Sequence, residues 1–224
     1  MATKSNHPWW RRRLRRGTCT PHSEVADVSI APAQRRVDQR PVLDLVAAEQ
    51  AAARFLAALD IDLDSESLRD TPRRMARAYA ELLTARPFDL TTFPNDEGYD
   101  ELVLARSIPI RSVCEHHLLP FVGVAHVGYL PGERILGLSK LARVVELFAH
   151  RPQVQERLTK QVADWLALEL APKGVGVVIE AEHLCMTLRG VRAAGATTVT
   201  STLFGALRDD PRSRGEFFSL TGAH

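Results

Sequence analysis

Between residues 101 and 207 the spacing of apolar residues changes twice, and this order limits the possible folds more than any other feature of the sequence. The strand-like segments are residues 101–110, 121–130, 175–188 and 196–207. Between the second and third of them, apolar residues recur at helical spacing from Ser139 and again after Pro152. This order indicates an α+β domain in which helices lie on one face of an antiparallel sheet. We predict that domain over residues 99–220, with a short C-terminal end at residues 221–224.

Two helices are predicted ahead of this domain. Apolar residues recur at i, i+3 and i+4 over residues 45–59 and again over residues 71–83, where Pro72 suits a first helical turn. The next segment, FDLTTFPNDEGYD at residues 88–100, is rich in Pro, Asn, Asp and Gly. We expect an irregular connection there. Residues 44–98 are therefore predicted to form an N-terminal helical arm and its connection.

The first 43 residues differ in composition from the rest of the chain. Residues 1–40 hold nine Lys and Arg against three Asp and Glu, a net charge of +6, and the remainder holds 20 against 24, or −4. Without a sustained apolar period, we expect residues 1–43 to form a basic, disordered tail. The run WWRRRLRR more often indicates a solvated end than a nucleic-acid site, so we expect no nucleic-acid partner. Because no apolar stretch follows the arginines or could span a membrane, we expect a cytoplasmic protein with no membrane association.

The three cysteines are sparse and odd in number. They are Cys19, Cys114 and Cys185. A chain of 224 residues has enough apolar material for a core without disulfides, so we expect reduced thiols that are free to bind metal or react. Cys114 and His117 have the C-x-x-H spacing that lets one turn direct both side chains at one metal ion. Alone, such a pair is more often a buried cysteine beside a hydrogen-bonded histidine.

A second Cys/His pair strengthens the case for a metal. If the segment EHLC continues a strand, His183 and Cys185 point to the same face. Cys114, His117 and Cys185 would then provide three ligands and leave a fourth tetrahedral position for water, as in catalytic zinc sites. His116 and His183 would remain nearby as acids or bases. A zinc deaminase is disfavoured because the H-x-E and P-C-x-x-C pairing is absent.

A third cluster lies at the start of the helix near residue 139. Ser139 is a plausible N-cap, and Lys140 and Arg143 project from the first turn, where main-chain N–H groups attract anions. A phosphate site and an ordinary solvated helix start explain this cluster equally well. For Glu156, a surface charge paired with Lys160 is the default interpretation from the residues alone.

Several long motifs resemble the GTP cyclohydrolase I family. They are CEHHLLPF, GLSKLARVVELFAHRPQVQERLT, AEHLCMTLRGV and TVTS, preceded by DTPRRMARAY and NDEGYDE. The similarity runs from about Asp44 to Leu220 and leaves out the basic tail. It implies the tunnelling fold for residues 99–220 and a homo-oligomer, typically a decamer with active sites between subunits. It also implies GTP as the substrate and zinc as the cofactor.

The resemblance also assigns roles to individual residues. The implied zinc ligands are Cys114, His117 and Cys185, and the implied catalytic histidines are His116 and His183. The implied triphosphate contacts are Ser139, Lys140, Arg143 and Arg189, with Arg74 added from a neighbouring subunit. The implied guanine-binding pair is Gln155 and Glu156.

In such enzymes water adds to C8 of guanine, the ring opens, formate leaves, and the product closes to 7,8-dihydroneopterin triphosphate, the first step of folate and pterin synthesis. His183 would protonate N7, His116 would assist later proton transfers, and Glu156 would accept from the guanine N1–H and amino group. Two other classes remain. A nitrile-reducing deazapurine enzyme of the same fold would use a cysteine nucleophile and NADPH. A non-catalytic zinc or nucleic-acid binder would have a closed four-ligand site.

Overall fold

The computed structural model describes residues 33–222. Its main sheet has five strands in the order β6-β3-β4-β7-β8, and the long strands pair antiparallel. The strands are β3 (Val103–Cys114), β4 (Pro120–Leu130), β6 (Pro152–Gln153), β7 (Gly174–His183) and β8 (Thr197–Gly205). The short β6 lies parallel to the end of β3. The predicted α+β class, with an antiparallel sheet, is confirmed.

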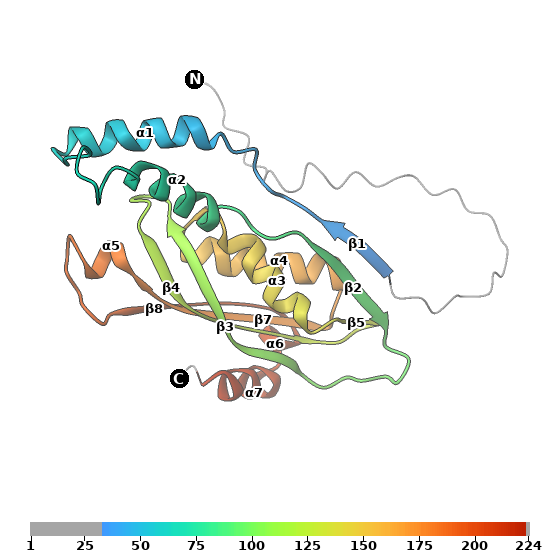
Figure 1. Cartoon of the computed structure of the whole chain (residues 1–224). Coiled ribbons are helices and arrows are strands. Elements are labelled where there is room, and N and C mark those ends of the chain that lie inside the picture. The colour runs from blue at the N-terminus through green and yellow to red at the C-terminus, as the bar shows by residue number, and fades with distance from the viewer. Residues whose placement is uncertain (1–32, 223–224) are drawn as a thin grey trace, which may run out of the picture. The chain divides into compact units, whose positions relative to one another are not determined.

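Helices cover both faces of this sheet, as Figure 1 shows. On one face α3 (Ser139–Ala149) packs against β3, and α4 (Gln155–Leu170) packs against β7 and β8. Their apolar stripes share one core with alternate residues of β7, among them Val177 and Ile179. On the other face, α6 (Ala206–Asp209) and α7 (Pro211–Thr221) follow the last strand. The expectation that helices lie on one face only is therefore wrong.

The sequence of β7 explains the second covered face. All of its residues from Gly174 to Ile179 are buried, so the strand lacks a polar side that water could solvate. Val178 packs with Phe217 of α7 in a separate apolar cluster. Gly128 and Gly176 leave room for the Phe217 ring, because a Cβ at Gly176 would lie 2.7 Å from it.

A second, three-stranded sheet forms, and two of its strands come from segments that we expected to be irregular. It consists of β1 (Ala33–Val37), β2 (Phe88–Pro94) and β5 (Arg134–Leu136), in that order. Phe88, Leu90 and Thr92 are buried at alternate positions of β2. The prediction of an irregular connection over residues 88–94 is therefore wrong, because a period of two lies among the turn-forming residues. Residues 33–37, assigned to the disordered tail, are a strand, and residues 1–32 lie outside the described part of the chain.

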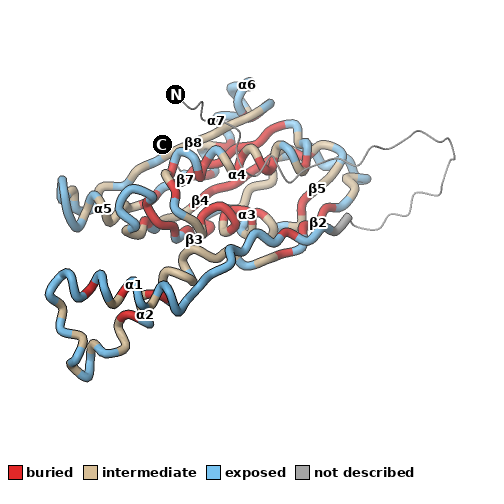
Figure 2. The backbone as a smooth tube through the Cα atoms, turned by 90° about the horizontal axis from the view of Figure 1, so that it is seen from above, coloured by how far each residue is buried: buried red, intermediate tan, exposed pale blue. Residues whose placement is uncertain are grey.

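The two helices before β2 match the predicted ranges. They are α1 (Leu45–Ala58), which Asp44 caps by accepting from the Ala47 N–H, and α2 (Thr71–Leu82). Only part of the α1 stripe is covered: Leu56 is buried, but Phe55 and Leu59 are more than half exposed. Figure 2 shows that most of α1 is exposed, whereas α2 mixes exposed, intermediate and buried residues. Among the described helices, none is long and apolar enough to cross a membrane.

Candidate active site

The tight turn after β3 brings Cys114, His116 and His117 together. The N–H of Cys114 donates to the Leu119 carbonyl at 2.9 Å, and the Leu118 N–H donates to the Cys114 carbonyl at 2.8 Å. This closes the chain into β4. The Cys114 Sγ lies 3.8 Å from Nδ1 of His116 and 3.9 Å from Nδ1 of His117. The spacing therefore does direct both imidazoles at one thiol.

Cys185 reaches the same place, but from a helical turn. The strand β7 ends at His183, and α5 (Leu184–Thr187) begins directly after it. The alternation argument that put His183 and Cys185 on one strand face is therefore wrong. The residues still meet, because ligand atoms of Cys114, His117 and Cys185 all lie within 4.8 Å of one another.

This donor set fits a metal ion. Two thiols and one imidazole are soft and borderline ligands of the kind that zinc takes in proteins. Cys114 is buried and Cys185 is half-buried. Burial raises the pKa of the Cys185 thiol, and the neighbouring Cys114 raises it further. A bound cation would reverse this preference by stabilising both thiolates.

His183 stands at the edge of this cluster with its ring held on two sides. Its ring stacks on Phe121 with centroids 4.4 Å apart and planes at 10°. Its Nε2 lies 2.7 Å from Oε1 of Gln155. Burial lowers the pKa of His183, and the charge of Glu156 partly offsets this effect.

The side chain of Gln155 is not free to contact a base. It is 2% exposed, and its Nε2 donates to the carbonyls of Ile179 at 3.0 Å and Thr198 at 2.8 Å. The structure therefore disagrees with the implied role of this side chain in guanine binding. Sequence reasoning missed the contact with His183 because it joins a helix start to a strand end 28 residues away.

Glu156 follows Gln155 in the chain, and its side chain is exposed. The expected surface pair with Lys160 does not form, because the Lys160 Nζ binds the Asp164 carboxylate at 2.7 Å. At the same end of the sheet, Nη1 of Arg189 lies 3.2 Å from Nε2 of His117. Glu156 and Arg189 thus both lie near the predicted metal ligands.

The other predicted phosphate contacts lie at the opposite end of the sheet. The Leu136 N–H, shortly before α3, donates to the hydroxyl of Tyr129 at 2.9 Å. Tyr129 and Phe121 are eight residues apart on β4, a length of about 26 Å. Ser139 is exposed at the first position of α3, whose N-cap is Leu138 rather than Ser139 as expected.

The other end of α3 lies near the predicted metal ligands, so the length of this helix also separates Ser139 from them. The carbonyl of Ala149, its last residue, accepts from the Ser112 hydroxyl at 2.7 Å, next to the predicted metal ligands. Ser139 begins the helix ten residues earlier, about 15 Å along the axis. Arg143 pairs with Glu146 at 3.1 Å. Within one chain, the structure does not bring Ser139 and Lys140 to the Cys/His cluster.

Arg74 is exposed on α2 and binds Asp70 at 3.4 Å and the Ser67 carbonyl at 3.4 Å. The helix α2 does approach the turn that carries Cys114 and His117, because the Tyr79 hydroxyl donates to the Leu118 carbonyl at 3.1 Å. The contacts of Arg74 itself are local.

Sequence reasoning also missed the contacts by which Arg157 holds the turn between β3 and β4, which carries Cys114 and His117. Arg157 of α4 binds the Glu115 carboxylate and donates from Nε to Oε1 of Gln153 at 2.8 Å. The hydrogen bond from Arg157 holds the pKa of Glu115 below its ordinary value. The main-chain N–H of Glu115 donates to the Gln153 carbonyl at 3.0 Å. No spacing rule in the sequence would have joined Glu115 to Arg157.

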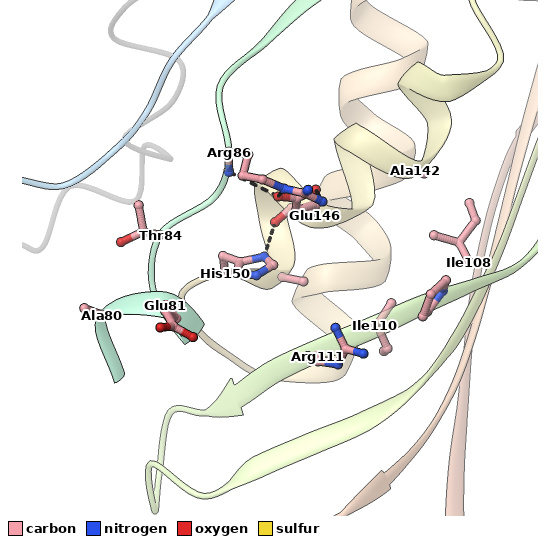
Figure 3. Close-up of a pocket in the computed structure, with 12 residues that line it drawn as sticks. Ala80, Glu81, Thr84, Arg86, Ile108, Ile110, Arg111, Ala142, Glu146 and His150 are labelled. Carbon is pink, nitrogen blue, oxygen red and sulfur yellow. Dashed lines mark hydrogen bonds and ion pairs between the residues drawn. The ribbon is translucent and has the colours of Figure 1, made fainter. Parts of the chain in front are cut away.

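A separate cavity of about 720 Å³ lies between α2, β3 and α3 (Figure 3). Its wall carries an ion pair in which Nε of Arg86 is 2.7 Å from Oε1 of Glu146. Burial alone would raise the pKa of Glu146, but bonds from Arg86 and the charge of Arg143 outweigh it and lower that pKa. None of the predicted metal ligands lines this cavity.

Comparison with known proteins identifies the family. Residues 48–222 match the family described as GTP cyclohydrolase I. A GTP cyclohydrolase 1 from Mycobacteroides abscessus is 54% identical over 184 residues, which cover 80% of this chain and 90% of the relative. The chain belongs to the GTP cyclohydrolase I family. GTP cyclohydrolase 1 proteins from Aquifex aeolicus and Streptomyces avermitilis are 53% and 56% identical, covering 77% of this chain in each case and 94% and 88% of the relatives.

The family resemblance stated from the motifs is thus confirmed, and the chain is an enzyme of the GTP cyclohydrolase I family. All the predicted site residues lie inside the matched range, while residues 1–47 lie before it. Among solved structures, the apo archaeosine synthase QueF-Like is 18% identical with a TM-score of 0.38, covering 46% of this chain and 93% of that chain. That likeness is too slight to bear on fold or activity.

Proposed function

We propose that this protein is a zinc-dependent GTP cyclohydrolase that converts GTP and water to 7,8-dihydroneopterin triphosphate and formate, a first step of folate and pterin synthesis. The observation that carries the proposal is the meeting of Cys114, His117 and Cys185 within 4.8 Å, with His183 and Glu156 at the same end of the sheet. The family match supplies GTP as the substrate class.

Cys114, His117 and Cys185 would hold the zinc ion, and three protein ligands are the number typical of a catalytic site. Zinc bound there would supply a water of lowered pKa, about 7, at neutral pH. The clamp between Arg157 and Glu115 holds the turn that carries two of these ligands. Second contacts of this kind orient ligands and commonly alter metal affinity by about 10- to 100-fold.

The remaining groups at this end would recognise and protonate the base. The exposed carboxylate of Glu156 would accept from the guanine N1–H and amino group, a donor pair that adenine lacks. Gln155 would contribute only its main-chain N–H, since first-turn N–H groups have no partner within the helix. His183 would give a proton to N7 of guanine, which makes C8 more open to attack by water, and His116 would assist the later proton transfers.

The triphosphate would be bound by two copies of the chain. Arg189 lies with the Cys/His cluster, whereas Ser139, Lys140 and Arg143 lie at the start of α3, about 15 Å from its other end. A second copy placing its α3 start beside the first copy's cluster would complete the site, with Arg74 from a further copy. This supports a homo-oligomer of the tunnelling fold, with a decamer as the proposed state and α1 and α2 as its N-terminal arm.

The exposed strand edges of the main sheet support such an assembly. In the described part of the chain, β8 is the last strand on one side, and β6 covers only two residues of β3 on the other. Unpaired edges of this kind are available for pairing with another copy.

The test is direct. Purified protein loaded with zinc and given GTP alone should release formate and a dihydropterin, detected by its fluorescence after oxidation, in equal amounts, and should do neither after chelation. Turnover that requires NADPH, or zinc binding without any consumption of GTP, would contradict the proposal. The first outcome would instead indicate a reductase, and the second a non-catalytic zinc protein.

A further inference from the structure

The carboxamide of Gln155 can take only one orientation. Its Nε2 faces the main-chain carbonyl oxygens of Ile179 and Thr198 at 3.0 and 2.8 Å. Carbonyl oxygens only accept, so the atom facing both must be the donating NH2 group. The Thr200 hydroxyl, 3.2 Å away, is a third neighbour of the same nitrogen. The amide oxygen therefore has to point at His183.

This orientation fixes where His183 carries a hydrogen. The distance from Oε1 of Gln155 to Nε2 of His183 is 2.7 Å. An amide oxygen only accepts, so Nε2 must be the donor, whether the imidazole is neutral or charged. The Phe121 ring, stacked at 4.4 Å, fixes the plane of the imidazole as well.

The geometry points to Gln155 as a positioning residue that binds Nε2–H of His183 and so leaves Nδ1 as the only nitrogen of His183 that can contact GTP. This inference rests on the proposed function, and it replaces the guanine-binding role of the Gln155 side chain. Because Gln155 sits on α4 and also holds β7 and β8, one side chain sets the imidazole relative to the start of α4. Glu156, the proposed guanine acceptor, is the next residue of that helix.

Kinetics of Gln155→Met separate positioning from binding. Methionine keeps the length of the side chain but removes the acceptor for His183. Misplacing a reacting group by about 1 Å can cost about 100-fold, so we expect kcat to fall by that order, with KM for GTP within about twofold and the zinc content unchanged. A raised KM with a retained kcat would overturn the inference, because it would show that Gln155 contacts the substrate.

Thr200→Val is the matched control for a merely structural effect. The Thr200 hydroxyl lies 3.2 Å from Nε2 of Gln155 and 2.6 Å from the Thr159 hydroxyl, so the change removes polar contacts from the same buried group. It leaves the bond between Gln155 and His183 in place. We expect kcat within a factor of about three of the unchanged protein. A loss as large as that of Gln155→Met would show that the whole group acts only through stability.

A spectroscopic readout tests the contact independently of turnover. In zinc-loaded protein labelled with 15N-histidine, the His183 signals are assigned by their absence in His183→Asn. In the neutral ring of His183 we expect a hydrogen-bonded proton on Nε2 and an unprotonated Nδ1. The hydrogen bond from Nε2–H should be lost in Gln155→Met and kept in Thr200→Val. A neutral His183 protonated at Nδ1 and bare at Nε2 would overturn the inference even if GTP is consumed. Conversely, the expected spectrum without GTP turnover would keep the contact and refute the proposed function.

Discussion

The two ends of the main sheet carry different halves of the proposed site. At one end, the three proposed metal ligands, His183 and Glu156 gather from a turn, a helical turn and a helix start. At the other end, Ser139, Lys140 and Arg143 lie at the start of α3 with none of these groups. The first end holds all three proposed metal ligands within one chain. The second end could bind the phosphates of the same GTP only if it came from another copy of the chain.

The largest effect is expected at the metal end. Cys185→Ser removes one of three ligands, so the variant should lose its zinc and at least about 1,000-fold in kcat, while keeping its circular dichroism spectrum. Metal analysis alongside formate release measures both. The matched control is Met186→Leu, one residue on, which should keep metal and turnover. A Cys185→Ser protein that turns over GTP without zinc would refute the ligand assignment.

Glu156→Gln tests base recognition at the same end. The change keeps the size of the side chain but replaces an acceptor oxygen with a donor, which leaves a guanine donor unpaired at about 1–3 kcal/mol. We expect kcat/KM for GTP to fall by about 10- to 100-fold. ITP, which lacks the amino group, should be a poor substrate for the unchanged protein and should lose less on this substitution. Equal kcat/KM for GTP in both proteins would show that Glu156 is only a surface charge.

Lys140→Ala tests the opposite end. Its ammonium should contact phosphate as a point charge, so we expect KM for GTP to rise by about tenfold, with a smaller rise for GDP and at high salt. Lys160→Ala, which loses an exposed pair with Asp164, is the matched control and should leave KM unchanged. An equal effect of Lys140→Ala on all guanine nucleotides would remove the phosphate role.

Glu146→Gln should give the smallest effect, on stability. The Glu146 carboxylate binds Arg86 and Arg143, and both arginines are partly solvated, so we expect the loss to be about 1 kcal/mol at pH 7. The pKa of Glu146 in the folded protein lies below the ordinary value of a glutamate side chain, 4.5, so this stabilisation is present above that pH and disappears as the pH falls through the folded pKa. The gap in melting temperature between the two proteins should therefore close in acid. A gap that stays constant down to pH 3 would contradict this.

The parts of the fold that sequence could predict are those with one strong period. The four long strands and helices α1 to α4 appear where apolar spacing placed them, although α1 buries only part of its apolar stripe and β8 has no fully buried residue. The strand β2 was missed because its sequence signal is short. Only Phe88, Leu90 and Thr92 follow a period of two, and Pro94 with the Asn and Asp after it is a stronger signal for a turn. The helix α7 was missed because Phe217 is its only buried apolar residue, which makes no helical period in the sequence.

The site was predictable in composition but not in arrangement. Motif spacing and the family resemblance named the three side chains that meet in the structure, yet Cys185 arrives from a helical turn rather than from the strand. The buried bond between Gln155 and His183 depends on tertiary packing that no local pattern encodes. The placement of Ser139 far from Cys114 also follows only from the register of β3, β4 and α3.

Mixed assembly of two variants tests the central claim that one site needs two copies. With GTP supplied well below the KM of the variants, Cys185→Ser chains and chains that combine Lys140→Ala with Arg143→Ala should each be nearly inactive alone. When they are co-expressed and purified together, a site pairing the intact metal end of one chain with the intact α3 start of the other should form in about a quarter of cases. We therefore predict formate release near a quarter of that of the unchanged protein. Activity no greater than the sum of the two separate variants would contradict the account.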